Sequence, residues 1–497
     1  MAAFIDTALD ATERITDPGL EPLAEDARSI AAGLTAAEGE TDALLRALTG
    51  RYISPSPCGD GSWNGREILP TGRNLHGAEQ DRVPTEFAYR RGREAAEALL
   101  EKYRAETGAL PEKAALNMTS LDVTRSGGEQ LGQFLALMGV KPVWNPSGRV
   151  EGLACIPLAE LGRPRVDVTA RISSVMRDAW PQLLVLMDRA VQLAAAQQEP
   201  EEQNFVRRNS KAIASLGEEG TGRVFGGQPG TYTSAVGLAL KASAWKNETD
   251  LAKYFIDSSS YLYGENKEGV RAPGSFAANV RQVDLTADVT ASRRTDGGAS
   301  SYSARVQGGY RLAARALGSK RELRQYMGET AADGSLKVVP MADHVTGAIR
   351  DTLLNDVWLE QVRAQGYGGA AELMSRIQNL FDTQCVLENL SPELLDDVAE
   401  RVLLDEELAA WFREANPHAL EESGRRFLEL HWRGKWNGDP QVLRRLQSAY
   451  LRAEGDLEDG TTGLGEIQAG NVEIVDSSRV EGWESRLKET EELLKHE

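Results

Sequence analysis

Apolar residues recur at helical spacing along much of the chain and alternate with short strand-like runs in one central stretch. The helical spacing predicts two helices before residue 50, a long helix between Thr85 and Gly108, and another over 175–197. Thr85 is a typical N-cap residue, and Gly108 is a typical stop signal just beyond a helix.

Strand-like runs lie between about residues 110 and 200. The segments KAALNM (113–118), KPVWN (141–145) and RPRVDVTARIS (163–173) read as strands, and GGEQLGQFLALMG (127–139) between them reads as a helix. This alternation of strand and helix favours an α/β layer. Residues 346–455 carry almost only helical patterns, with Gly, Asn or Pro at most of the joints.

The predicted fold class is therefore a helix-rich, mixed α/β protein, in which an α/β layer is followed by a mostly helical C-terminal region. The predicted units are an N-terminal helical segment (1–50), an α/β domain with a polar loop (51–200), an irregular mixed α/β region (201–345), a helical domain (346–455) and a flexible tail (456–497).

Charge and composition argue against nucleic-acid partners and against a membrane span. The net charge is −19, and a field of that sign repels phosphate backbones and anionic lipid surfaces, so we expect no nucleic-acid partner. No run approaches the about 18 apolar residues of a membrane span, and the N-terminus lacks the pattern of a secretory leader. Three widely spaced cysteines suggest reduced thiols, so we expect a cytoplasmic protein.

Familiar catalytic motifs do not occur in the sequence. It has no phosphate-binding loop of the G-x-x-x-x-G-K-[ST] type, so we expect no ATP bound in that way. The glycine-rich segment 221–232 lacks the lysine of such a loop and reads as a structural turn or as a turn at the edge of a ligand. His76 lies in a polar loop, which favours either a solvent-exposed side chain or, with carboxylates nearby, metal handling and proton abstraction. Its polar neighbours in that loop are Arg73, Asn74, Glu79 and Asp81.

Arginines and carboxylates gather around the strand-like run at 163–173. Such arginines suit bidentate binding of ligand carboxylates, but they suit an internal ion-pair network equally well. The sequence leaves both interpretations open. The residues concerned are Arg163, Arg165, Asp167, Arg171, Arg177 and Asp178, and Glu199, Asn204 and Arg207 follow after the next predicted helix.

Several of these segments resemble, in the same order, consecutive stretches of the large subunits of cobaltochelatase and magnesium chelatase. The stretches include ILPTGRNLHGAEQDRVPT, MTSLDVTRSGGEQLGQFLALMG, RVFGGQPGTYTSAV and WFREANPHALEESGRRFLELHWRGKW. The resemblance runs from about Tyr52 to Glu454. Each stretch alone is a weak signal, but their common order is specific.

The resemblance implies insertion of a divalent metal (Co, Mg or Ni as substrate) into a tetrapyrrole. It also implies partners: an AAA+ ATPase that hydrolyses ATP on another chain, and a von Willebrand-type subunit. On this interpretation the candidate substrate-binding residues are Arg73, Asn74, Arg163, Arg165, Arg177 and Asn204. The candidate catalytic residues are His76, Glu79, Asp81 and Asp178, with Glu129 as a fifth and His76 also as the candidate metal ligand.

Two departures from the family pattern shape the expectation. The chain resembles the C-terminal half of these subunits, and the family's upstream T-H-G segment has no counterpart in it. Arg293 and Arg294 stand where the family carries an acid-rich motif. We therefore expect the C-terminal half of a split chelatase that acts with a separate chain carrying the T-H-G segment. The alternatives are a non-catalytic carrier of a tetrapyrrole or metal complex, or an enzyme that removes the metal.

Overall fold

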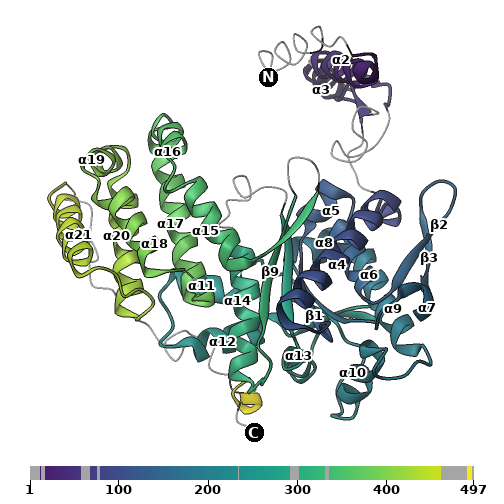
Figure 1. The fold of residues 1–497 in the computed structure, drawn as a ribbon. Coiled ribbons are helices and arrows are strands. Elements are labelled where there is room, and N and C mark those ends of the chain that lie inside the picture. Colours follow the sequence, from purple (N-terminus) through teal and green to yellow (C-terminus); the bar gives the residue numbers. More distant parts are fainter. Residues whose placement is uncertain are drawn as a thin grey trace.

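An eight-stranded sheet with helices on both faces forms the body of the protein (Figure 1). The computed structural model describes residues 12, 17–37, 39–56, 68–74, 79–232, 234–290, 301–330, 335–388, 390–460, 488 and 490–494. The strands of the large sheet are β1 (Lys113–Met118), β4 (Asp167–Ile172), β5 (Val224–Gly226), β6 (Tyr261–Gly264), β7 (Lys267–Arg271), β8 (Leu285–Thr290), β9 (Arg324–Thr330) and β10 (Leu336–Pro340). A separate hairpin consists of β2 (Val140–Trp144) and β3 (Val150–Cys155).

The strand order in the large sheet is β10-β9-β8-β1-β4-β5-β6-β7. The five central strands, from β9 to β5, run parallel, and the outer strands β10, β6 and β7 pair antiparallel. Both β1 and β4 are buried along their whole length, as expected for parallel strands covered on both faces.

Helices cover both faces of this sheet (Figure 1). The helices before and between the strands are η1 (Pro18–Leu20), α2 (Glu21–Ala36), α3 (Gly39–Leu48), η3 (Gln80–Arg82), α4 (Glu86–Thr107), α5 (Ser120–Ser126), α6 (Glu129–Leu137), α7 (Leu158–Leu161), α8 (Ser174–Ala179), α9 (Pro181–Ala196), α10 (Phe205–Ala214), α11 (Ala235–Lys241), α12 (Glu248–Ser259), α13 (Pro273–Val280) and α14 (Ser301–Ala316). Alternate residues of β1 serve the two faces: Ala114 and Leu116 pack with α4, α6 and α9, whereas Ala115 packs with α12, α13 and α14.

A helical region follows the sheet and extends its second core. Its elements are α15 (Met341–Asp351), α16 (Asp356–Arg363), α17 (Tyr367–Leu387), α18 (Pro392–Val398), the π-helical η4 (Ala399–Leu404), α19 (Glu406–Ala415), α20 (Pro417–Trp432) and α21 (Pro440–Gly460). Helix α17 lies against α14, and α20 and α21 follow it outward (Figure 1). Among the described helices, none is both long and apolar enough to cross a bilayer.

The predicted fold class, a helix-rich α/β layer followed by a mostly helical region, is confirmed. The predicted limits of the long helix are also confirmed, since Thr85 accepts a hydrogen bond from the Ala88 amide and Gly108 adopts the left-handed conformation. Two details differ from the prediction. The helix expected over 175–197 is two helices, because Trp180 leaves the helical conformation and Pro181 begins α9. The boundary expected at residue 200 does not divide the sheet, because β4 and the short β5 pair across it.

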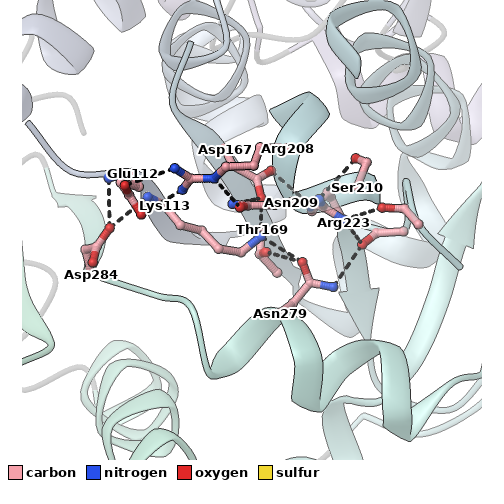
Figure 2. Close-up of polar contacts among 12 residues, drawn as sticks. Glu112, Lys113, Asp167, Thr169, Arg208, Asn209, Ser210, Arg223, Asn279 and Asp284 are labelled. Carbon is pink, nitrogen blue, oxygen red and sulfur yellow. Dashed lines mark hydrogen bonds and ion pairs between the residues drawn. The ribbon is translucent and has the colours of Figure 1, made fainter. Parts of the chain in front are cut away.

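A buried ion cluster ties together the amino ends of the parallel strands (Figure 2). Asp167 bonds Lys113 through Oδ2, accepts a hydrogen bond of 2.8 Å from Arg223 Nε at Oδ1, and accepts one of 3.0 Å from the Asn209 amide. Lys113 also donates to Asn279 at 2.8 Å. Burial opposes ionisation of Asp167, but Arg223 and Lys113 hold the pKa of its carboxyl well below its usual range. The three charged side chains are 0% exposed, so their role is to join β1, β4 and the residue before β5.

We predict that Asp167→Asn lowers the free energy of unfolding by about 3–5 kcal/mol, because it leaves two buried cations without a counter-charge. Urea denaturation followed by circular dichroism measures the change. The matched control is Glu201→Gln, which breaks the exposed ion pair with Lys211 and should leave the midpoint where it is. Equal midpoints for Asp167→Asn and the wild type would contradict the structural role of this cluster.

Candidate functional site

The loops that follow the parallel strands meet at the edge of the sheet opposite the buried ion cluster. From β1 the chain proceeds through β4 to β5 on one side, whereas β8 and β9 lie on the other side of β1. The direction of the connections therefore reverses between β1 and β8. Ligands of open α/β sheets bind at such reversal points, outside the carboxyl ends of the strands. We refer to this edge, formed by the ends of β1, β4, β5 and β8 and the residues after them, as the carboxyl edge.

An arginine, an aspartate and a tyrosine form one cluster on the carboxyl edge. Helix α8 begins directly after β4, and Arg177 on it donates to Asp178 at 2.5 and 2.9 Å. The hydroxyl of Tyr232, from the loop after β5, donates to Asp178 at 2.6 Å, and the Arg177 guanidinium lies 5.4 Å from the centre of its ring. Arg177 also donates to the carbonyl of Gln228 at 2.7 Å, which joins α8 to that loop.

The cluster keeps Asp178 ionised. Its hydrogen bonds with Arg177, and then with Tyr232, lower the pKa of Asp178 to about 2. Two of the predicted site residues, Arg177 and Asp178, therefore meet on the carboxyl edge. Tyr232 was not predicted from the sequence; it is 67% exposed and lies in the glycine-rich segment 221–232. The interpretation of that segment as a turn at the edge of a ligand fits this position.

Of the predicted loop residues, Glu79 and Asp81 lie beside this cluster. Gln80 donates to the Ala179 carbonyl at 2.9 Å and so holds η3 against the end of α8. Glu79 and Asp81, on either side of Gln80, form ion pairs with Arg149 from the β2–β3 loop. The described part of the loop also contains Arg73, which is exposed, and Asn74, which donates to the Ile68 carbonyl at 2.7 Å. His76 lies outside the described residues, as do Arg293 and Arg294.

The structure places Arg163, Arg165 and Asn204 away from the carboxyl edge, before β4 and before α10. Arg165 is only 1% exposed and binds Glu199 with both Nε and Nη2 at 2.8 Å. Asn204 donates to the same carboxylate at 2.8 Å, and Arg163 binds Glu97 at 3.0 and 3.1 Å. Of the two interpretations left open by the sequence, the internal ion-pair network therefore describes these three residues.

Two aspartates that were not predicted from the sequence lie between the ends of β1 and β8. Asp122, in the first turn of α5, accepts hydrogen bonds from the Ser126 hydroxyl at 2.9 Å and from the Gln130 amide nitrogen at 3.0 Å. The side chain of Gln130 donates to Asp288 on β8 at 2.7 Å, and Asn117 on β1 donates to it at 2.6 Å. Asp122 comes four residues after the strand-like run 113–118, and that was the signal available for it in the sequence.

The carboxyl groups at this point are harder to ionise than usual. Burial raises the pKa of Asp122 to about 7, and the neighbouring charges of Glu129 and Asp288 act in the same direction. Burial also raises the pKa of Asp288 and of Glu129, the fifth predicted catalytic residue. A carboxyl whose pKa lies near neutrality both accepts and releases protons, so Asp122 suits general acid–base chemistry. In the described part of the chain, no three His, Cys, Asp or Glu side chains are grouped closely enough to hold a metal ion.

We predict that Asp122→Asn changes how stability depends on pH. Between about pH 4 and pH 7 folded Asp122 keeps a proton that the unfolded chain releases, so its contribution is full below that range and is lost as the pH rises through 7. Relative to the wild type, Asp122→Asn should therefore be more stable at pH 8 than at pH 4.5, as measured by urea unfolding. Asp178→Asn is the control, since the lowered pKa of Asp178 makes its contribution constant over this range. If the free energy of unfolding of Asp122→Asn differed from that of the wild type by the same amount at both pH values, the raised pKa of Asp122 would be contradicted.

Several known proteins are similar to this chain in sequence or in structure. The family model described as CobN/Magnesium Chelatase matches residues 5–443. An uncharacterised protein of Methanocaldococcus jannaschii is 37% identical over 88% of this chain and 36% of its own length. A magnesium-chelatase subunit of Chlorobaculum parvum is 30% identical over 90% of this chain and 35% of its own length. The structure of the catalytic subunit of cobaltochelatase from Mycobacterium tuberculosis superposes with a TM-score of 0.81, at 31% identity, over 92% of this chain and 40% of that one.

The chain thus spans about a third of the length of the curated relatives that it matches. The family match covers far more than half of the chain, and the structural match includes both the sheet and the helical region. The chain belongs to the CobN/magnesium chelatase family.

Proposed function

We propose that this chain holds a metal-free tetrapyrrole at its carboxyl edge and takes part in the insertion of a divalent metal into it. The observation that carries the proposal is the combination of two kinds of carboxyl group on one edge. Asp178 is ionised and fixed by Arg177 and Tyr232, whereas Asp122 has a pKa near neutrality. Family membership gives this combination its chemical context.

Metal insertion requires that the pyrrole N–H protons leave and that the metal ion loses water. A group with a pKa close to the working pH is the most effective proton acceptor, which suits Asp122. An oriented, ionised carboxylate attracts a dication and replaces part of its water shell, which suits Asp178. Arg177 restricts the orientation of that carboxylate, and Tyr232 restricts it from the solvent side. The metal is a substrate on this account, with cobalt, magnesium and nickel as the candidates.

We further propose that the complete reaction needs other chains. The sequence has no phosphate-binding loop, and the described residues hold no grouped metal ligands, so ATP hydrolysis and part of the metal coordination are assigned to partners. An AAA+ ATPase, a von Willebrand-type subunit and a chain carrying the T-H-G segment fit these roles. The carboxyl edge would then act together with the groups that these chains supply.

A non-catalytic tetrapyrrole carrier is the second candidate function. It is favoured by one observation, that no group of three metal-binding side chains occurs among the described residues. A carrier binds the macrocycle without inserting a metal, whichever partners are added. The two functions therefore differ in a single measurable step.

We predict that Asp178→Asn and Tyr232→Phe slow metal insertion without abolishing macrocycle binding. The measurement is the absorbance change on metallation of a porphyrin and of a corrin-type acid, with the purified chain, its ATPase complex, its T-H-G partner and each candidate metal. Asp178→Asn removes the oriented carboxylate and should lower the rate of metal insertion by about 10²–10⁴-fold, the range of general acid–base and charge effects. Tyr232→Phe keeps the carboxylate and should lower that rate less.

Glu201→Gln, which alters an exposed ion pair on the other side of the sheet, is the matched control and should insert metal at the wild-type rate. Binding of the macrocycle with no insertion under any combination would establish the carrier instead. A wild-type chain that binds neither macrocycle would contradict both functions.

A further inference from the structure

Arg171 differs from every other buried arginine of the described chain. Among the described residues, five arginines are buried, and four of them form an ion pair with a carboxylate. The pairs are Arg165–Glu199 at 2.8 Å, Arg177–Asp178 at 2.5 Å, Arg223–Asp167 at 2.8 Å and Arg426–Glu429 at 3.0 Å. Arg171 is 5% exposed and has no described carboxylate within ion-pair distance. A buried charge without a counter-charge lowers the free energy of unfolding. A bound anionic ligand would supply the missing counter-charge.

Arg171 lies at the carboxyl edge, where the proposed function places the ligand. It is the penultimate residue of β4, so its side chain starts at the carboxyl edge. Its guanidinium donates through Nη1 to the carbonyl of Ile172 at 2.5 Å and to the hydroxyl of Tyr302 at 3.1 Å, and through Nε to Ser259 at 3.5 Å. The second terminal nitrogen, Nη2, has no hydrogen bond to any residue that the structure describes. One edge of the planar guanidinium is thus left for a ligand.

Tyr302 completes a pair of donors. It lies in the first turn of α14, and its hydroxyl accepts the bond from Arg171, which leaves its own proton without an acceptor among the described residues. A guanidinium N–H and a phenolic O–H side by side suit the two oxygens of one carboxylate.

A third group next to this pair is also unsatisfied. Asn117 is the register partner of Arg171 on the adjacent strand β1, so the two side chains lie on the same face of the sheet. Asn117 is 2% exposed, and its Oδ1 has no hydrogen-bond donor among the described residues, although its Nδ2 donates to Asp288. Buried acceptors are rarely left unpaired, but an ionised carboxylate has no proton to donate, so Oδ1 of Asn117 marks a polar position beside the pair and does not bind the carboxylate itself.

We propose that Arg171 and Tyr302 form the binding site for a carboxylate side chain of the macrocycle, with Asn117 beside it. This rests on the proposed function, because the carboxylate belongs to the tetrapyrrole acid that the carboxyl edge would hold. The proposal moves the carboxylate-binding role from Arg163 and Arg165, whose donors bond to groups inside the protein, to Arg171, whose Nη2 has no hydrogen bond to a described residue. The site anchors the periphery of the ring, and the chemistry of insertion stays with Asp122 and Asp178.

The test compares two probes on the full chain: a metal-free porphyrin dicarboxylic acid and its dimethyl ester, each titrated by fluorescence quenching. The wild type should bind the acid about 10- to 100-fold more tightly than the ester, as expected for a partly buried bond to a charged group. Tyr302→Phe and Arg171→Lys should each reduce this preference at least about tenfold, mainly through weaker binding of the acid.

Two matched variants show whether the effect belongs to this site. Tyr326→Phe removes the hydroxyl of another buried tyrosine, which donates to Glu106 at 2.6 Å, and Arg208→Lys alters an arginine bound to Glu112 at the amino ends of the strands. Both should keep the wild-type preference. Urea midpoints within error of the wild type identify the variants that are folded, and Tyr302→Phe alone suffices if Arg171→Lys is unstable.

The outcomes separate the two proposals. Equal binding of acid and ester by the wild type, or an unchanged preference in folded Tyr302→Phe, overturns the carboxylate site and leaves the proposed function standing. Failure of the wild type to bind either probe overturns the proposed function and the carboxylate site with it. Loss of the preference in the two site variants alone supports the assignment.

Discussion

The arrangement of this sheet depends on one buried carboxylate. Asp167 is the shared counter-charge of Lys113 and Arg223, and together they join the amino ends of β1 and β4 to the residue before β5. Two cations without Asp167 would be uncompensated in a fully buried setting, which no packing of apolar side chains offsets. Because β1 and β4, with six residues each, start side by side at this cluster, their carboxyl ends and the loops after them are also fixed in relation to one another.

The two edges of the sheet use the same side-chain types for different purposes. At the amino ends, Lys113, Asp167 and Arg223 are fully buried and bonded to one another (Figure 2). At the carboxyl edge, Asp178 and Tyr232 are partly or largely exposed, and Asp122 holds its proton near neutral pH. The polar network is buried at the amino ends and accessible to solvent at the carboxyl edge. This is the pattern expected of an α/β sheet whose ligand site lies at the carboxyl ends of its strands.

Local signals in the sequence were enough for the helix ends and for one pair of site residues. Thr85 and Gly108 act within one turn of the helix that they bound, and Arg177 and Asp178 are neighbours in the chain. The interpretation of Arg165 needed Glu199, which lies 34 residues away and comes close only when α9 packs on the sheet.

The missed residues have partners that are still more distant in the chain. Asn117 and Asp288 are 171 residues apart, and Tyr232 reaches Asp178 over 54 residues. No pattern within one segment indicates such contacts, since they follow from the strand order β8-β1-β4-β5. The sequence therefore predicted the fold class and the family resemblance, but it could not tell arginines that are paired inside the protein, such as Arg165, from arginines that a ligand could reach.

The most direct test of the central claim is hydrogen–deuterium exchange of the full chain with and without a metal-free porphyrin dicarboxylic acid. If the carboxyl edge holds the macrocycle, amides in 119–130, 173–182 and 227–232 should exchange more slowly when it is bound. Those around Lys113 and Arg223 should remain as slow as before. Protection confined to the helical region 346–455, with the loops of the carboxyl edge unchanged, would contradict the account.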